Sequence, residues 1–146
     1  MSLEMSLGGD GARIVLTVRG FENPRAPDPD DAKWLDCQVT FGTAGVQAAV
    51  AGSLMITEIQ EFVRELDAAT RLLDGGALLD SMEGWLRIEV SLRRTGHAAV
   101  SAQLVEAGNA RATLKLDFQS DQTFTRAAVA EWARVVQDLS RSSDAR

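Results

Sequence analysis

The sequence of 146 residues contains one cysteine, Cys37, one histidine, His97, and no tyrosine. A single cysteine excludes an internal disulfide and a zinc site built from several thiolates. A single histidine excludes metal sites that need several imidazoles. The chain also lacks any apolar run of about 18 residues, and its N-terminus has no basic segment followed by an apolar stretch. The sequence therefore predicts neither a membrane span nor a secretion signal, and we expect a cytoplasmic protein without metal or cofactor.

The composition indicates one folded, acidic domain. Hydrophobic residues make up 45% of the chain, which is enough for a packed core at this length. Asp and Glu number 21 against 15 Lys and Arg, so the net charge is −6. Because nucleic-acid binding needs basic surface, this charge argues against a nucleic-acid partner.

All three prolines lie within six residues, at Pro24, Pro27 and Pro29, in a segment that is also acidic. Proline cannot continue a ladder or a helix interior, so the sequence predicts a long acidic loop here. Asp28, Asp30 and Asp31 offer clustered oxygen atoms but lack the ligand spacing of a calcium loop. Two interpretations stay open, a solvated loop and a loop that docks a partner.

Period-two alternation of apolar residues predicts six strands, and a 3.6-residue period predicts two helices. The expected strands cover residues 13–19, 34–41, 46–54, 85–92, 98–105 and 111–118. One helix is expected to begin at a capping box formed by Thr57 and Gln60 and to end near Leu73, and the second to be capped by Asp121 or Thr123 and to end at Leu139. Trp85–Leu92 repeats the residue classes of Trp34–Phe41, which indicates either a duplication or two strands under the same packing demands.

These elements predict an α+β domain in the order βββα-βββα. We expect one six-stranded, mainly antiparallel, curved sheet with both helices packed on its apolar face. Residues 1–11, rich in Ser and Gly, are expected to form a disordered tail, residues 12–140 the single domain, and residues 141–146 a polar C-terminal tail.

Few side chains indicate chemistry, and no catalytic residues are predicted. Cys37 lies in the apolar register of its strand, where a thiol is inert. Glu58, Glu61 and Glu65 share a helix flank, which is either a solvated surface or a site for a basic protein. The candidate partner-binding residues are Asp28, Asp30, Asp31, Trp34, Asp36, Trp85 and Glu89. Trp34 and Trp85 fall on the polar register, so each ring either anchors a partner on the exposed sheet face or folds over the sheet edge as part of the core.

Several segments together resemble the WapI family of bacterial immunity proteins. They are Trp34-Leu35 after the acidic loop, Thr57-Glu58-Ile59 with Phe62 and Leu66, Trp85-Leu86, and Phe118 followed by Asp121-Gln122-Thr123. The likeness extends from Ala12 to Leu139. It implies a small cytoplasmic antitoxin that binds and blocks the C-terminal domain of a cognate toxin without catalysis. The acidic charge would suit a basic nuclease domain as the partner.

A second hypothesis from the residues is a small-ligand binding module, which would require an apolar cavity with a few converging polar groups. The oligomeric state is also open between monomer and homodimer, because an antiparallel sheet edge invites pairing unless it is blunted.

Overall fold

The computed structural model describes residues 2–144 and contains two separate four-stranded antiparallel sheets. The first sheet has the order β1-β2-β3-β4, and the second has the order β5-β6-β7-β8. The strands are β1 (Leu3–Gly9), β2 (Ala12–Phe21), β3 (Trp34–Thr43), β4 (Gln47–Met55), β5 (Gly75–Asp80), β6 (Leu86–Leu92), β7 (His97–Ala107) and β8 (Arg111–Asp121). Helix α1 (Ile56–Leu72) follows the first sheet, helix α2 (Gln122–Asp144) follows the second, and a short 3-10 helix occupies Asp31–Lys33.

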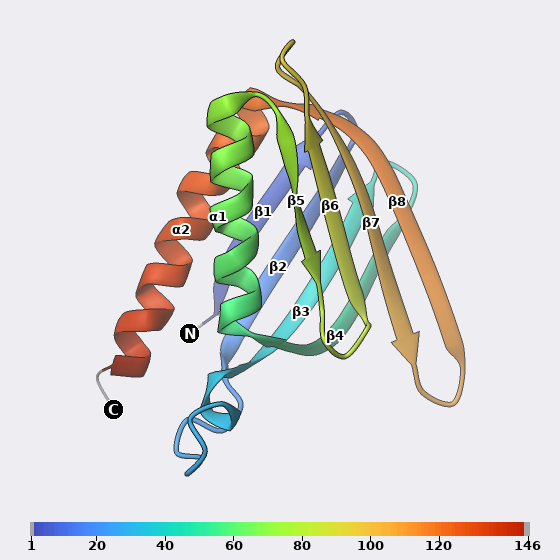
Figure 1. Ribbon diagram of the computed structural model, residues 1–146. Coiled ribbons are helices and arrows are strands. Elements are labelled where there is room, and N and C mark those ends of the chain that lie inside the picture. The colour runs from blue at the N-terminus through green and yellow to red at the C-terminus, as the bar shows by residue number, and fades with distance from the viewer. Residues whose placement is uncertain (1, 145–146) are drawn as a thin grey trace.

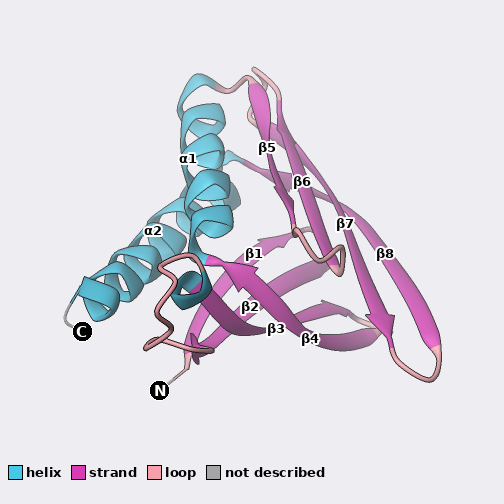
Figure 2. Ribbon diagram, turned by 60° about the horizontal axis from the view of Figure 1, so that its bottom comes forward, coloured by secondary structure: helices cyan, strands magenta, loops and turns pink. Residues whose placement is uncertain are grey.

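The two sheets face each other at a steep angle, and the two helices close the side where the sheets diverge (Figures 1 and 2). Helix α1 packs along β5, and helix α2 packs along β1. The helices also contact each other, with the rings of Phe62 and Trp132 5.2 Å apart. The apolar core therefore lies between three walls, because each sheet contributes one face and the helices contribute the third. Neither helix in the described part of the chain is long and apolar enough to cross a membrane.

The expected single six-stranded sheet is wrong, because two strands were missed and they complete two separate sheets. Residues 1–11 were expected to be a disordered tail, yet 3–9 form β1, which pairs with β2 and buries Met5 and Leu7 completely. Strand β5 was hidden by Gly75 and Gly76, although Ala77 and Leu79 alternate into the core. At the other end, α2 continues to Asp144, so most of the expected C-terminal tail is helical, and residues 145–146 lie outside the described residues.

The element order is four strands and a helix, repeated once. The similar segments at Trp34 and Trp85 do not occupy equivalent places in this repeat. Trp34 opens the third strand of the first sheet, whereas Trp85 precedes the second strand of the second sheet. The sequence likeness thus comes from two strands with the same alternation, and the repeat of the architecture is independent of it.

Side chains from the helices occupy the outer edges of β1 and β5. The backbone N–H of Ser6 donates to Glu131 Oε1 (2.5 Å), and the Ser6 carbonyl accepts from Trp132 Nε1 (3.0 Å). On β5, the N–H of Leu78 donates to Glu65 Oε1 (3.0 Å). Each helix therefore binds outward backbone groups near the middle of the edge strand that it covers, which hinders pairing of that edge with another chain.

Two glycines let the sheets approach each other closely. A Cβ at Gly9 would lie 2.3 Å from the carbonyl oxygen of Gln119, and a Cβ at Gly52 would lie 2.2 Å from the indole of Trp85. At the first junction, the N–H of Asp10 donates to that same Gln119 carbonyl (2.8 Å). The two sheets are thus joined at two points where any side chain larger than glycine would collide.

Candidate functional site

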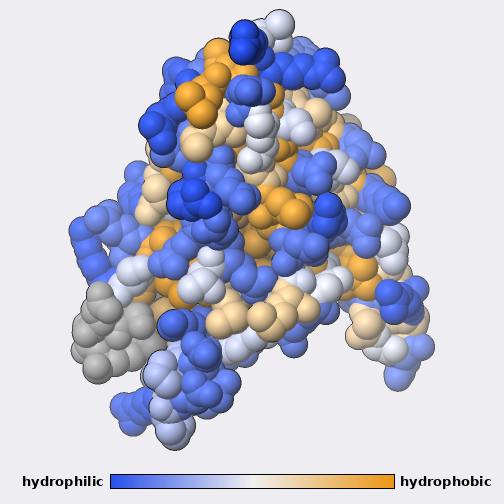
Figure 3. All heavy atoms as spheres, viewed as in Figure 1, coloured by the Kyte–Doolittle hydropathy of each residue, from blue (hydrophilic) through white to orange (hydrophobic). Residues whose placement is uncertain are grey.

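The loop between β2 and β3 carries three exposed aspartates, Asp28, Asp30 and Asp31. The Asp28 carboxylate accepts from the N–H of Asp30 (2.9 Å), which fixes a turn of the kind that Asp forms locally. Lys33 makes an ion pair with Asp30 (3.7 Å). Residues 22–36 contain five acids and two bases, a net charge of −3, which is half of the net charge of the chain. The prolines hold this charge on a loop that projects from the body as a hydrophilic surface (Figure 3).

Trp34 and Asp36 follow this loop on β3, and both are half-buried. Asp36 lies directly opposite Ser53 of β4, on the solvent side of the first sheet. The Ser53 hydroxyl in turn donates to the carboxylate of Glu22 at the start of the loop. The acidic loop and the adjoining end of this sheet face are therefore in contact, and together they carry a net negative charge.

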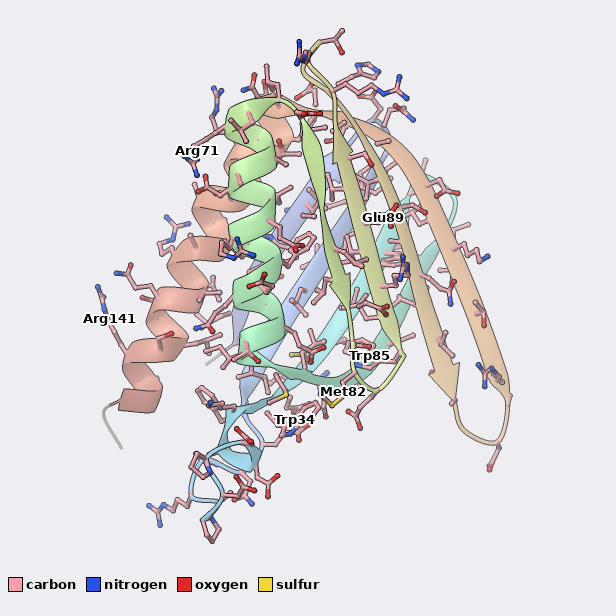
Figure 4. All side chains as sticks on the ribbon, viewed as in Figure 1. Trp34, Arg71, Met82, Trp85, Glu89 and Arg141 are labelled. Carbon is pink, nitrogen blue, oxygen red and sulfur yellow. The ribbon has the colours of Figure 1, made fainter. Side chains whose placement is uncertain are left out.

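Met82 was not identified from the sequence and lies beside this surface. The residue is 71% exposed in the turn between β5 and β6. Its backbone N–H donates to Glu58 Oε2 (2.9 Å), while Glu58 Oε1 accepts from the N–H of Met55 (2.9 Å), the residue paired with Trp34. Figure 4 shows Trp34 and Met82 at the same end of the molecule. The signal in the sequence was a methionine within a polar turn segment, Ser81-Met82-Glu83-Gly84.

Trp85 and Glu89 lie elsewhere. Trp85 is only 7% exposed, its ring covers Gly52, and its Nε1 donates to the carbonyl of Ser53 (2.8 Å). The alternative in which this ring folds over a sheet edge is therefore confirmed, and its indole is not available as a surface anchor. Glu89 is exposed on the outside of the second sheet, where it pairs with Arg87 (3.2 Å). Figure 4 places it well along β6, away from Trp34.

The acidic flank of α1 is largely occupied by contacts within the chain. Glu58 and Glu65 accept backbone N–H groups, as described above. Glu61 pairs with Arg64, whose hydrogen bonds lower the pKa of the Glu61 carboxyl. The expected capping box at Thr57 is displaced, because α1 begins at Ile56 and Glu58, not Gln60, reaches back to the start of the helix. At α2, Asp121 is the cap, since its carboxylate accepts from the backbone N–H groups of Thr123 (2.8 Å) and Phe124 (3.1 Å).

The remaining candidates for chemistry are placed apart from one another. Cys37 is fully buried, and burial raises the pKa of its thiol to about 12, with smaller contributions from the charges of Asp36 and Glu22. His97 is exposed at the start of β7. Among residues 2–144 no three His, Cys, Asp or Glu side chains are positioned to hold a metal ion.

The hollows that the described residues form are open to solvent and lie on the surface. One, of about 370 Å³, lies between β1 and α2 and is lined in part by Arg13, Phe124 and Glu131. Two smaller ones lie beside β8. One, of about 180 Å³, is between β8 and the β3–β4 hairpin end at Phe41, Thr43 and Val46, and the other, of about 230 Å³, is between β4 and the β7–β8 pair. None of these three hollows is the enclosed apolar cavity, with a few converging polar groups, that a small-ligand module would need.

The comparisons with known proteins identify a family. The profile of the Immunity protein WapI-like family matches residues 5–140, which confirms the resemblance and extends it to include most of β1. Among solved structures, the chain is similar to the plant transcriptional regulator PBF-2, with a TM-score of 0.60 and 14% identity over 99% of this chain and 86% of that one. At this identity the likeness is one of fold alone. A search of curated proteins gives no significant match. The chain belongs to the WapI-like family of immunity proteins.

Proposed function

We propose that this chain is a cytoplasmic immunity protein that binds one cognate bacterial toxin domain and blocks it without catalysis. The observation that carries the proposal is the membership of the family, which matches nearly the whole folded part of the chain. A chain with a single exposed histidine and a buried, protonated cysteine has few groups for acid–base or nucleophilic work. Binding is therefore the better explanation of its action.

The surface that we assign to the toxin is the acidic face, defined as Asp28, Asp30, Asp31, Trp34, Asp36 and Met82. It combines a strongly negative loop with two apolar side chains, one half-buried and one exposed. Aromatic and methionine side chains are enriched in the centres of protein interfaces, and charges around them steer the partner and exclude competitors. Of the seven candidate residues from the sequence, Trp85 and Glu89 lie outside this face.

The charge of the acidic face fits a basic partner, such as the active-site cleft of a nuclease domain. The net charge of −3 over residues 22–36, which cover the loop and the start of β3, would attract such a cleft, and the loop would occupy the place of its anionic substrate. This mode of inhibition requires no change in either chain's covalent structure. It also predicts that association slows as salt is raised.

Co-expression tests this function directly. The toxin-like C-terminal domain encoded next to this chain should arrest growth when expressed alone, and growth should recover when the chain is present. The two proteins should also purify as a complex. Growth arrest that persists in the presence of the folded chain, with no complex, would overturn the proposal.

A further inference from the structure

The four edge strands of the two sheets differ in what covers them. Side chains from the helices bind β1 and β5 near the middle of each strand, as described above. Strands β4 and β8 each accept one hydrogen bond at a main-chain carbonyl from outside their own ladder, near one end of the strand, and apolar residues of both strands also line a common hollow. The Ser53 carbonyl of β4 accepts from Trp85, and the Gln119 carbonyl of β8 accepts from Asp10. In the described part of the chain, β8 otherwise pairs only with β7.

The bond at Gln119 shows which backbone groups of β8 point outward. In an antiparallel ladder the N–H and C=O of one residue point to the same side, and the side alternates along the strand. The pairing of β8 with β7 is continuous from Arg111 to Asp121. Since Gln119 points away from β7, the backbone groups of Thr113, Lys115 and Asp117 do so as well. Figures 1 and 2 both show β8 at the outer border of the second sheet.

We propose that β8 is a dimer interface, at which a second copy of this chain adds its own β8 antiparallel to form a continuous eight-stranded sheet. This inference does not depend on the proposed function. It rests on the open backbone groups, on the charge pattern of the strand and on apolar side chains that the contact would cover.

The charges of β8 select one register. When Arg111 faces Asp117 of the second copy, the two-fold axis produces two such opposite-charge pairs, and Thr113 faces Lys115. Moving the register by one step in one direction sets Arg111 against Lys115, and in the other direction sets Lys115 against itself. Like charges directly opposite each other destabilise a strand pair, whereas opposite charges stabilise it. The second of these registers also sets Arg111 against Gln119, whose outward carbonyl is already occupied, and a further step in the first direction leaves a ladder of only a few residues.

The same register joins apolar side chains on the inner face. Leu114 then meets Leu114 of the second copy at the axis, and Ala112 faces Leu116. Leu114 and Leu116 are only half-buried in the single chain. Leu114 lines both hollows beside β8, and Leu116 lines the one next to the β3–β4 turn. Pairing would cover them, which adds a hydrophobic contribution to the main-chain hydrogen bonds. The open edge of β4 is a weaker candidate for pairing with a second copy. Its residues, Gln47–Met55, include no charged side chain to select a register and are mostly small.

Charge reversal at the two ends of the contact tests this interface. Sedimentation equilibrium of the purified chain at up to about 0.5 mM should give a monomer–dimer equilibrium, since a single added ladder buries less than a standard interface. Arg111→Asp and Asp117→Arg should each raise the dimer dissociation constant about tenfold or more, because each turns two attractive pairs into repulsive ones. The double variant should restore dimerisation.

The control is Asp138→Arg, which makes the same change of charge as Asp117→Arg at an exposed position on α2. It should leave the dissociation constant unchanged, and at a concentration where the parent is monomeric all variants should keep its unfolding midpoint. A chain that stays monomeric at about 0.5 mM, a dimer that survives Asp117→Arg, or a double variant that stays as weak as the single ones would each overturn the proposal. Loss of toxin binding in the β8 variants of a monomeric chain would assign this edge to the toxin instead.

Discussion

The indole Nε1 of Trp85 donates a hydrogen bond of 2.8 Å to the carbonyl oxygen of Ser53, so a residue that leads into the second sheet binds the edge of the first. The ring lies over Gly52, where there is room only because glycine has no side chain. This contact explains why a large aromatic residue on the polar register is buried. A methyl group added at Gly52 would collide with this ring and disturb the junction between the sheets.

Gly52→Ala should therefore destabilise the fold. The new Cβ would lie 2.2 Å from the indole of Trp85, and the ring would have to move and lose its bond to Ser53. Overpacking of this kind costs about 1–3 kcal/mol. The control is Gly42→Ala on β3, where an added Cβ has nothing within 4 Å. Urea unfolding should show a lower midpoint for Gly52→Ala alone, and equal midpoints for both variants would contradict the junction.

Glu58→Ala should also destabilise the fold. One carboxylate accepts from Met55 at the start of α1 and from Met82 in the β5–β6 turn, so its removal leaves two N–H groups without these partners. We expect a loss of about 0.5–2 kcal/mol in the free energy of unfolding, because the Met55 bond caps α1 and water can reach the Met82 N–H. Glu61→Ala, on the same helix, removes only an exposed pair with Arg64 and should leave the midpoint nearly unchanged. If both variants behave alike, Glu58 does not join the two elements.

The buried thiol of Cys37 should make stability fall at alkaline pH. Burial raises its pKa from 9.0 to about 12, so the unfolded chain releases this proton at a lower pH than the folded chain. The contribution of the protonated thiol to the free energy of unfolding is fully present below pH 9. It is lost between pH 9 and 12, at up to about 1.4 kcal/mol per pH unit. Cys37→Ala should be less sensitive over this range. A thiol reagent that modifies the native protein rapidly at pH 8 would show that Cys37 is accessible.

The acidic loop should speed association with the toxin domain. Changing Asp28, Asp30 and Asp31 to Asn should lower the association rate constant about tenfold at low salt and have less effect at high salt, because salt screens exposed charges. A control with the same change of charge replaces the exposed Asp74, Glu106 and Asp138 by their amides. Stopped-flow mixing measures the rate. An equal slowing in both variants would mean that only the overall charge matters.

The local elements could be predicted from the sequence because alternation and helical spacing depend on nearby residues. The strands at Arg13 and Trp34 and both helices were predicted within a few residues of their observed positions. Strands β1 and β5 could not be recognised, since Gly8–Gly9 and Gly75–Gly76 conceal a short alternation. Without them the remaining strands were joined into one sheet, and the division into two sheets was lost.

The candidate site depended more strongly on contacts between distant segments. The acidic loop was visible from its prolines and aspartates alone. The burial of Trp85 could not be predicted, because it depends on Gly52, which lies 33 positions earlier in the chain. The carboxylates of Glu58 and Glu65 likewise accept backbone N–H groups from the β5–β6 turn and from β5, which lie beyond α1 in the sequence. Residue spacing shows which side chains share a face, but not what the rest of the fold brings against that face.

The most direct test of the proposed function is a titration of the purified cognate toxin domain with this purified chain. The measured quantity is the toxin's own activity on its substrate. We predict that activity falls linearly and reaches zero near one immunity chain per toxin domain, and that the Asn variant of the acidic loop inhibits more slowly. Undiminished toxin activity in the presence of a large excess of the folded chain would contradict the function that we propose.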